Sequence, residues 1–147
     1  MDVVKEFKKR FSKKILAIKE HAENRIYIDI NKEDIVEASK LLFQDLGIRF
    51  VIATGLDTPK GIEIVYHFSE DETGKLISLR VLIEDKKKPE IDSVGQHIPA
   101  FNWIEREIWE LLGVNFKGHQ NLTHLLLIDD WPKEDFPLRH DRKAKKK

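Results

Sequence analysis

The stretch that decides the fold runs from Phe101 to Trp131 and reads FNWIEREIWELLGVNFKGHQNLTHLLLIDDW. Its first part predicts a helix over residues 102–112, because apolar side chains recur there at intervals of three and four and so share one face. These side chains are Phe101, Ile104, Ile108 and Leu111. Pro99 precedes the helix, where a missing N–H is tolerated, and Gly113 follows it, where a left-handed cap residue belongs.

The chain around this helix has two further local features. Arg106 and Glu110 are four residues apart on the face that we expect to be exposed, so they lie within reach of each other, and Arg106 could instead pair with a carboxylate on a partner protein. After Gly113 the apolar period changes from helical to alternating, which predicts an extended segment that ends in a turn at Lys117 and Gly118.

Composition limits the class of protein. The chain has 147 residues, of which 41% are hydrophobic and 35% charged, as expected for one globular domain with a single core. Its formal net charge is +0, which argues against a protein built mainly to bind nucleic acid. There is no cysteine, so the chain offers neither disulfides nor thiolate ligands for zinc or iron–sulfur clusters. The apolar runs are too short to span a membrane, and the first residues lack the apolar core of a signal peptide, which predicts a cytosolic chain.

The N-terminal half predicts two helices and one strand. An apolar stripe predicts an amphipathic helix from Asp2 to Glu23, docked on its own domain or lying on a membrane or partner. The stripe consists of Val4, Phe7, Phe11, Ile15 and Ile18. Arg25–Ile30 alternates as a strand does, and a second helix follows from a cap at Asn31 to Leu46.

Three further strands complete the predicted fold. Apolar alternation marks them at residues 48–54, 62–68 and 76–83, and their short connections predict antiparallel pairing. We therefore expect an α+β domain with a mostly antiparallel four-stranded sheet, two helices packed on one face, a further motif-bearing helix and an extended C-terminal segment. Residues 1–128 form the predicted domain, and residues 129–147 form an extended docking segment with a basic tail.

The sequence shows no convincing catalytic or metal site. His119 and His124 have the right side-chain type for a metal, but their spacing matches no established zinc motif. Glu105 and Glu107 are two residues apart on a helix and point to different sides, so they cannot work as an acid–base pair. We therefore expect no catalytic, cofactor-binding or metal-binding residue in this chain, and no enzymatic activity of the chain alone.

Several side chains are instead typical of a protein interface. Tryptophan and arginine are enriched where interfaces gain most of their binding energy, and the segment DDWPKEDFPLR is too apolar for a linker. Trp109 is as well explained by core packing as by an interface. The candidate interface residues are Trp103, Glu105, Arg106, Glu107, His119, Asp129, Asp130, Trp131, Phe136, Pro137, Leu138 and Arg139.

The motif EREIWELLGVNFKGH, followed by DDW and FPLRHD, resembles the family of the C subunit of respiratory complex I, an NADH dehydrogenase. The equivalent accessory subunit of energy-converting, membrane-bound nickel–iron hydrogenases carries the same pattern. Gln120 departs from it, because the family usually has proline after the histidine. The resemblance implies a subunit without cofactors that packs against the large, D-like protein of the complex on the cytoplasmic side of the membrane.

The resemblance also implies where the cofactors of such a complex lie. In the hydrogenase branch the nickel–iron site belongs to the large subunit, and iron–sulfur clusters belong to the small and ferredoxin-like subunits. In the complex I branch iron–sulfur clusters and a quinone take these roles, and the membrane arm is only an indirect partner. The chain stops soon after Pro137-Leu138-Arg139, which favours the hydrogenase branch, with a quinone-reducing complex as the alternative.

Two functions of other classes are weaker alternatives. A nucleic-acid-binding module would use the lysines of the first helix and the C-terminal tail, but the zero net charge argues against it. A metal-dependent hydrolase would use the histidines, and elemental analysis of the pure protein decides that question.

Overall fold

The computed structural model of the chain describes residues 1–142. The basic tail at 143–147, which the sequence predicts to be dispensable for folding, lies outside the described residues. In chain order the elements are α1 (Val3–Phe11), β1 (Ile15–Ala22), β2 (Arg25–Ile30), α2 (Ile35–Lys40), β3 (Arg49–Thr58), β4 (Gly61–Glu70), β5 (Lys75–Ile83), β6 (Glu90–Asp92), α3 (Asn102–Leu112) and β7 (Asn115–Lys117). A π-helical turn over Leu41–Asp45 extends α2, and a 3₁₀ turn over Pro99–Phe101 leads into α3.

The main sheet has five strands in the order β1-β2-β5-β4-β3. The hairpins β3–β4 and β4–β5 are antiparallel, as the short connections predicted. The pairing of β2 with β5 is parallel, which makes the sheet mixed. The α+β class is therefore confirmed, whereas the predicted four-stranded, mostly antiparallel sheet is correct only in part.

The fifth strand, β1, was predicted to be helix. The helix that begins after Asp2 ends at Phe11, and residues 15–22 form a strand that pairs with β2 through a two-residue turn. Ile15 and Ile18 follow Phe11 at helical spacing, so the apolar period does not separate the two alternatives. Pairing with β2 decides the outcome, because a strand at a sheet edge gains a ladder of hydrogen bonds that an isolated helical turn lacks.

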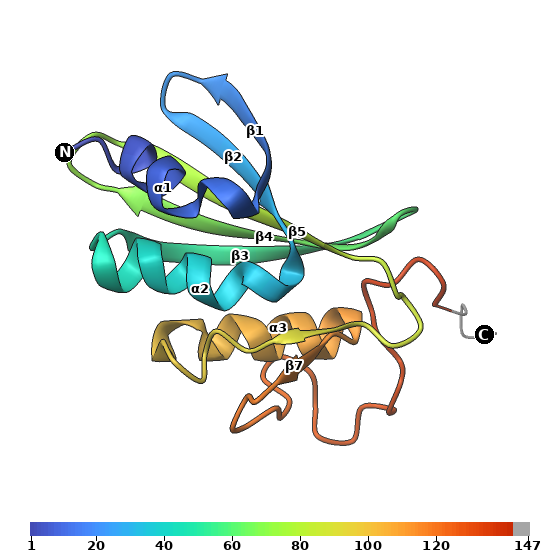
Figure 1. Cartoon of the computed structure of the whole chain (residues 1–147). Coiled ribbons are helices and arrows are strands. Elements are labelled where there is room, and N and C mark those ends of the chain that lie inside the picture. The colour runs from blue at the N-terminus through green and yellow to red at the C-terminus, as the bar shows by residue number, and fades with distance from the viewer. Residues whose placement is uncertain (143–147) are drawn as a thin grey trace.

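One face of the sheet carries the core. Apolar residues alternate along β2, β4 and β5 and point to this inner face, where α1, α2 and α3 all add side chains to one cluster. Figure 1 shows α1 and α2 on the same side of the sheet and α3 beside β3. Phe101, at the start of the motif, is fully buried, and its ring stacks on that of Phe50 with 3.7 Å between centroids.

The motif helix reaches the sheet at a glycine. Gly55 of β3 lies under α3, and a Cβ atom there would lie 2.5 Å from Cδ1 of Leu112, so a larger residue would force that side chain to shift. Gly113 ends α3 in the left-handed conformation, with φ of 79°, as the sequence predicted. The following strand, β7, pairs in parallel with β6 as a second, two-stranded sheet.

Candidate docking surface

The motif helix α3 carries a buried carboxylate on its domain side. The side chain of Glu105 is 1% exposed and accepts hydrogen bonds from the backbone N–H of Gly95 and from Oγ of Ser93, the latter at 3.2 Å. Burial raises the pKa of this carboxyl group to about 7, because these donors offset only part of the desolvation. Glu105 therefore fixes the turn at residues 93–95 and has no carboxylate oxygen at the surface.

A second buried carboxylate on α3 holds the loop that follows β7. Glu110 is 2% exposed and accepts hydrogen bonds from the backbone N–H groups of Leu125, Leu126 and Leu127 at 2.7 to 3.3 Å. Nδ1 of His124 donates to the same carboxylate at 3.1 Å. Burial alone raises the pKa of Glu110, but the hydrogen bonds outweigh it and the net pKa is lowered. Glu110 is thus a charged anchor for a loop without regular structure.

Arg106 and Glu110 both bind the loop after β7 and form no ion pair with each other within residues 1–142. Arg106 donates to the backbone oxygens of Thr123 at 3.0 Å and His124 at 2.7 Å, and Glu110 accepts from residues 124–127 of the same loop. The prediction that this face of α3 is exposed is wrong for Glu110, because the loop at 121–128 covers it. Two residues four apart on a helix can bind each other, but they can equally both bind another segment, as they do here.

The candidate metal ligands His119 and His124 are occupied separately. Nε2 of His119 donates to the backbone oxygen of Asn102 at 3.0 Å, and Nδ1 accepts from the N–H of Asn121. Because His124 instead faces Glu110, the two imidazoles serve different contacts. Within residues 1–142 no group of three or more histidine and acidic side chains is arranged to hold a metal ion.

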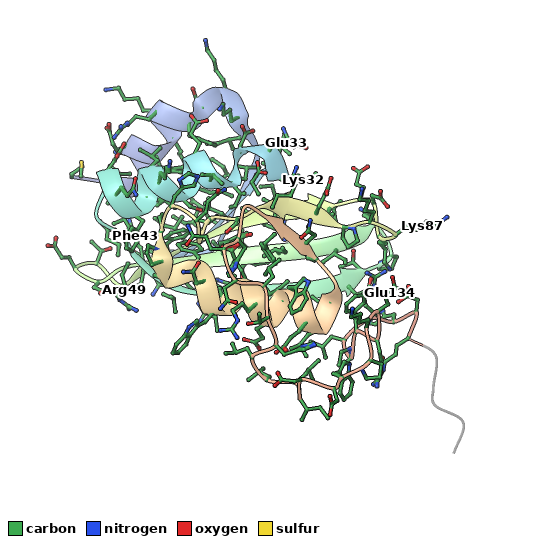
Figure 2. The ribbon with its side chains drawn as sticks, turned by 90° about the horizontal axis from the view of Figure 1, so that it is seen from below. Lys32, Glu33, Phe43, Arg49, Lys87 and Glu134 are labelled. Carbon is green, nitrogen blue, oxygen red and sulfur yellow. The ribbon has the colours of Figure 1, made fainter. Side chains whose placement is uncertain are left out.

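The C-terminal segment is tied back to the domain by Arg139. Its side chain is 8% exposed and donates to the backbone oxygens of Leu112 at 3.2 Å and Lys86 at 2.7 Å. The next residue, His140, donates its N–H to the buried carboxylate of Asp57 at 2.8 Å. This carboxylate also pairs with Lys86. Figure 2 shows Glu134 of this segment and Lys87 at the same end of the molecule.

The apolar residues of the segment divide into two groups. Phe136 is half-buried with its ring against Gly113, and the indole of the half-buried Trp131 donates to the backbone oxygen of Asp135 at 2.7 Å. Trp103, by contrast, is 73% exposed, and Leu138 is 53% exposed. Leu126 and Ile128, from the loop that Glu110 holds, are 63% and 69% exposed. Apolar side chains therefore remain in solvent on ordered, well-anchored backbone.

The remaining candidate residues are distributed as follows. Asp129 and Asp130 are exposed, Pro137 is half-buried, and Glu107 lines a groove between α3 and β3. The structure thus places Trp103, Asp129, Asp130 and Leu138 at the surface and leaves Glu107 half-buried, while Glu105, Arg106, His119 and Arg139 serve contacts within the chain. We call Trp103, Glu107, Leu126, Ile128 and Leu138 the docking surface.

Sequence reasoning missed two residues that organise this region. Asp57 is the buried acceptor that holds the C-terminal segment and Glu110 the one that holds the loop at 124–127, and both look like ordinary surface acids in the sequence. Asp57 lies in an apolar strand and Glu110 follows Trp109 in the motif, yet neither position reveals which N–H groups the carboxylate will meet.

None of the helices in residues 1–142 is long and apolar enough to cross a membrane.

Comparison with known proteins identifies the motif. The model of the family described as "Respiratory-chain NADH dehydrogenase, 30 Kd subunit" matches residues 28–147. The C subunit of NADH-quinone oxidoreductase from Nocardioides sp. is 31% identical over 124 residues, which are 77% of this chain and 49% of the relative. The C/D subunit of NADH-quinone oxidoreductase from Bacteroides thetaiotaomicron is 32% identical over 103 residues, which are 68% of this chain and 19% of the relative. The chain thus spans about half the length of the first relative and a fifth of the second.

A solved structure has the same fold over nearly the whole chain. It is described as the membrane-bound sulfane sulfur reductase (MBS), an archaeal respiratory membrane complex, and one of its chains is similar with a TM-score of 0.84. The match covers 98% of this chain and 85% of that one at 23% sequence identity.

Proposed function

The chain belongs to the family of the 30 kDa subunit of respiratory-chain NADH dehydrogenase, and from this premise we propose that it docks onto a large, D-like protein as a non-catalytic subunit of a membrane-associated redox complex. It corresponds to the C subunit of a complex I-like assembly, and its docking surface carries Trp103, Leu126, Ile128 and Leu138.

The observation that carries the proposal is the exposure of large apolar side chains on rigid backbone. Trp103 is 73% exposed at the start of α3, and Leu126, which a buried carboxylate holds, is 63% exposed, so both lower the solubility of the lone chain without stabilising it. Such ordered apolar residues are the anchors that protein interfaces use, because little conformational entropy is lost when they bind.

Relatives support the identity of the partner. The relative in Bacteroides thetaiotaomicron carries the double name C/D, so a single chain there combines both subunits. Two proteins that are fused in one organism and separate in another usually touch when they are separate. A D-like large subunit is therefore the partner that we propose for the docking surface.

The buried carboxylates of α3 and β3 support a non-catalytic role. Glu105, Glu110 and Asp57 are buried and bind backbone N–H groups of the chain itself, so their carboxylates are already used in holding the structure. We propose that the iron–sulfur clusters of the complex lie in small and ferredoxin-like subunits, that the membrane arm contacts this chain only indirectly, and that the complex faces the cytoplasm.

Two reactions are candidates for the whole complex. The first is that of an energy-converting hydrogenase, whose large subunit holds a nickel–iron site, and it rests on the resemblance of the motif. The second is quinone reduction by a complex I-like dehydrogenase, and the relatives named NADH-quinone oxidoreductase favour it. Purified complex that contains nickel and evolves hydrogen supports the first, and nickel-free complex that reduces quinone supports the second.

The docking proposal is tested by co-expressing the chain with its D-like partner. Trp103→Ala should weaken the complex by about 2 kcal/mol, roughly 30-fold in dissociation constant, and leave the melting temperature of the lone chain unchanged. Trp131→Ala should also weaken the complex, since Trp131 lies in the same C-terminal segment as Leu138. Leu16→Ala, at a leucine that is 62% exposed on β1, is the control and should change neither quantity.

Two outcomes would contradict the proposal. Wild-type chain that does not co-purify with the D-like partner would refute the docking itself. Unfolding of the isolated domain by Trp131→Ala would place that tryptophan in the core and remove the C-terminal segment around it from the interface.

A further inference from the structure

The two edges of the main sheet differ in how they face solvent. The edge strand β1 contains Lys19, Glu20 and His21, and its pairing with β2 is interrupted by register shifts near both ends. Charged residues and bulges of this kind prevent an edge from pairing with another strand. The other edge strand, β3, is uncharged over the seven residues FVIATGL at 50–56, and beyond Ile52 its pairing with β4 is regular.

The β3 edge exposes apolar side chains as well as free backbone. Val51, Ile52 and Leu56 are 43%, 47% and 47% exposed. Residues 50–56 combine β-branched and aromatic side chains with no proline, which is the composition of a strand that pairs readily. An uncharged edge of this length is a liability in a lone chain, and it is explained if another strand covers it in the assembled protein.

The motif helix α3 forms a roof beside this edge. Figure 1 shows α3 next to β3, at the end of the sheet rather than over its middle. A groove of about 200 Å³ lies between them. It is lined by Ile52 and Thr54 from β3, by Ile104, Glu107 and Leu111 from α3, and by Leu138. Ile104 and Leu111 are seven residues apart on one face of α3, so the groove has an apolar roof along two helical turns.

The charge in the groove indicates what can enter it. Glu107 carries the charge among the lining residues, and within residues 1–142 it forms no ion pair. A strand that enters between β3 and α3 therefore meets the apolar side chains of α3 and the carboxylate of Glu107. A segment with alternating apolar residues and a lysine or arginine opposite Glu107 complements both.

We infer that β3 accepts a sixth strand from the D-like partner, which pairs with the free edge and places apolar side chains under α3 and a basic side chain against Glu107. The inference rests on the proposed function for the identity of the partner, and it adds the mode of binding: main-chain pairing along β3. Leu138 belongs both to the groove and to the docking surface, so one partner surface can cover the two without a break. A second copy of this chain fits less well, because its residues 50–56 bring no positive charge to Glu107.

The test is hydrogen exchange of the chain alone and in complex with the co-expressed D-like partner. The backbone amides of residues 52–57 should exchange at least tenfold more slowly in the complex, with protection on alternate residues, because a pairing strand binds every second N–H of an edge. Amides of β1 at residues 17–21 serve as the internal control and should exchange at the same rate in both samples.

Substitutions give a second, independent measurement. Ile52→Lys should lower the affinity for the D-like partner at least tenfold, whereas Leu16→Lys, at an exposed residue of the opposite edge strand, should change it less than twofold. Glu107→Gln should lower the affinity severalfold and reduce its dependence on salt. Ile52→Lys and Glu107→Gln should both keep the melting temperature of the wild type, since neither residue is part of the core.

The outcomes separate this inference from the proposed function. A complex that forms normally but leaves the β3 amides unprotected, or that tolerates Ile52→Lys, refutes the sixth strand and leaves docking intact. A lone chain that dimerises through β3, with Ile52→Lys making it monomeric and the complex unaffected, assigns the edge to a second copy and also refutes it. Wild-type chain that forms no complex refutes the proposed function together with this inference.

Discussion

Two carboxylates on the same helix have almost no exposed surface, yet their pKa values shift in opposite directions. Glu105 and Glu110 are 1% and 2% exposed, yet burial raises the pKa of Glu105 to about 7 while the pKa of Glu110 is lowered. Glu105 faces the domain, where one carboxylate oxygen has no hydrogen-bond partner within the described chain. Glu110 faces the loop at 124–127, which supplies three backbone N–H groups and an imidazole.

The difference arises from depth and donors together, because Glu105 lies deeper in the domain and Glu110 meets more hydrogen-bond donors. Each hydrogen bond to a carboxylate favours the ionised form, and desolvation favours the neutral one. On the domain side desolvation dominates. On the loop side the donors dominate, so the loop is held by a full charge and charge-assisted hydrogen bonds. Helix α3 therefore packs on an apolar core with one face and, with the other, holds the loop at 124–127 through polar contacts.

The largest expected effect is that of Glu110→Ala. The substitution leaves three backbone N–H groups and His124 without their acceptor, so the free energy of unfolding should fall by about 3 to 4 kcal/mol at pH 7. Chemical denaturation measures this loss, and faster exchange of the amides at 125–127 locates it. Glu107→Ala on the same helix is the matched control and should cost less than about 0.5 kcal/mol.

The contribution of Glu110 to the free energy of unfolding should depend on pH. Because its folded pKa is lowered from 4.5, its contribution is fully present above pH 4.5 and is lost as the pH falls through the folded pKa. The difference in stability between the wild type and Glu110→Ala should therefore be smaller at low pH than at pH 7. Equal stability of the two proteins at pH 7 would show that the loop does not depend on this carboxylate.

Glu105 should make the free energy of unfolding depend on pH in the direction opposite to Glu110, and Glu105→Gln should remove that dependence. With a folded pKa of about 7 against 4.5, the stability that Glu105 gives is fully present below pH 4.5 and is lost as the pH rises through 7. The free energy of unfolding of the wild type should fall, from this group alone, by about 3 kcal/mol over that range. The glutamine variant should lack this fall, so the difference between the two curves isolates Glu105.

The measurement is a series of denaturation curves from pH 4 to pH 8 on both proteins. Parallel curves would mean that Glu105 has an ordinary pKa and that its surroundings resemble those of Glu110. The two carboxyl groups would then not differ in the direction of their pKa shifts.

The smallest expected effect is that of Arg106→Lys, which tests whether the loop needs a planar fork as well as an anchor. Arg106 donates to Thr123 and His124, and a lysine retains the charge but reaches only part of this set. We expect a loss of about 1 kcal/mol in the free energy of unfolding and no change in the pH dependence that Glu110 causes. A loss as large as that of Glu110→Ala would make Arg106 an anchor of equal weight.

The sequence alone predicted the elements whose apolar residues follow one period. The strand at 25–30, the strands predicted at 48–54, 62–68 and 76–83 and the helix α3 with its glycine cap were expected from local pattern, and so was the family. The N-terminal region shows the limit: Ile15 and Ile18 continue a helical stripe, but the chain leaves the helix at Phe11. The fifth strand and the parallel pairing of β2 with β5 could not be predicted, because each depends on a partner far away in the sequence or on a choice between equal periods.

The tertiary structure alone decided which contacts each charged residue of the motif makes. Glu105, Arg106, Glu110 and Arg139 are all polar positions of one sequence pattern, and each binds backbone atoms of a segment that no spacing rule identifies. The sequence determines that a helix presents the first three on particular faces, since 3.6 residues make a turn in any context. Which loop then covers each face is set by the path of the whole chain, and with it whether a carboxylate is neutral, charged or free to meet a partner.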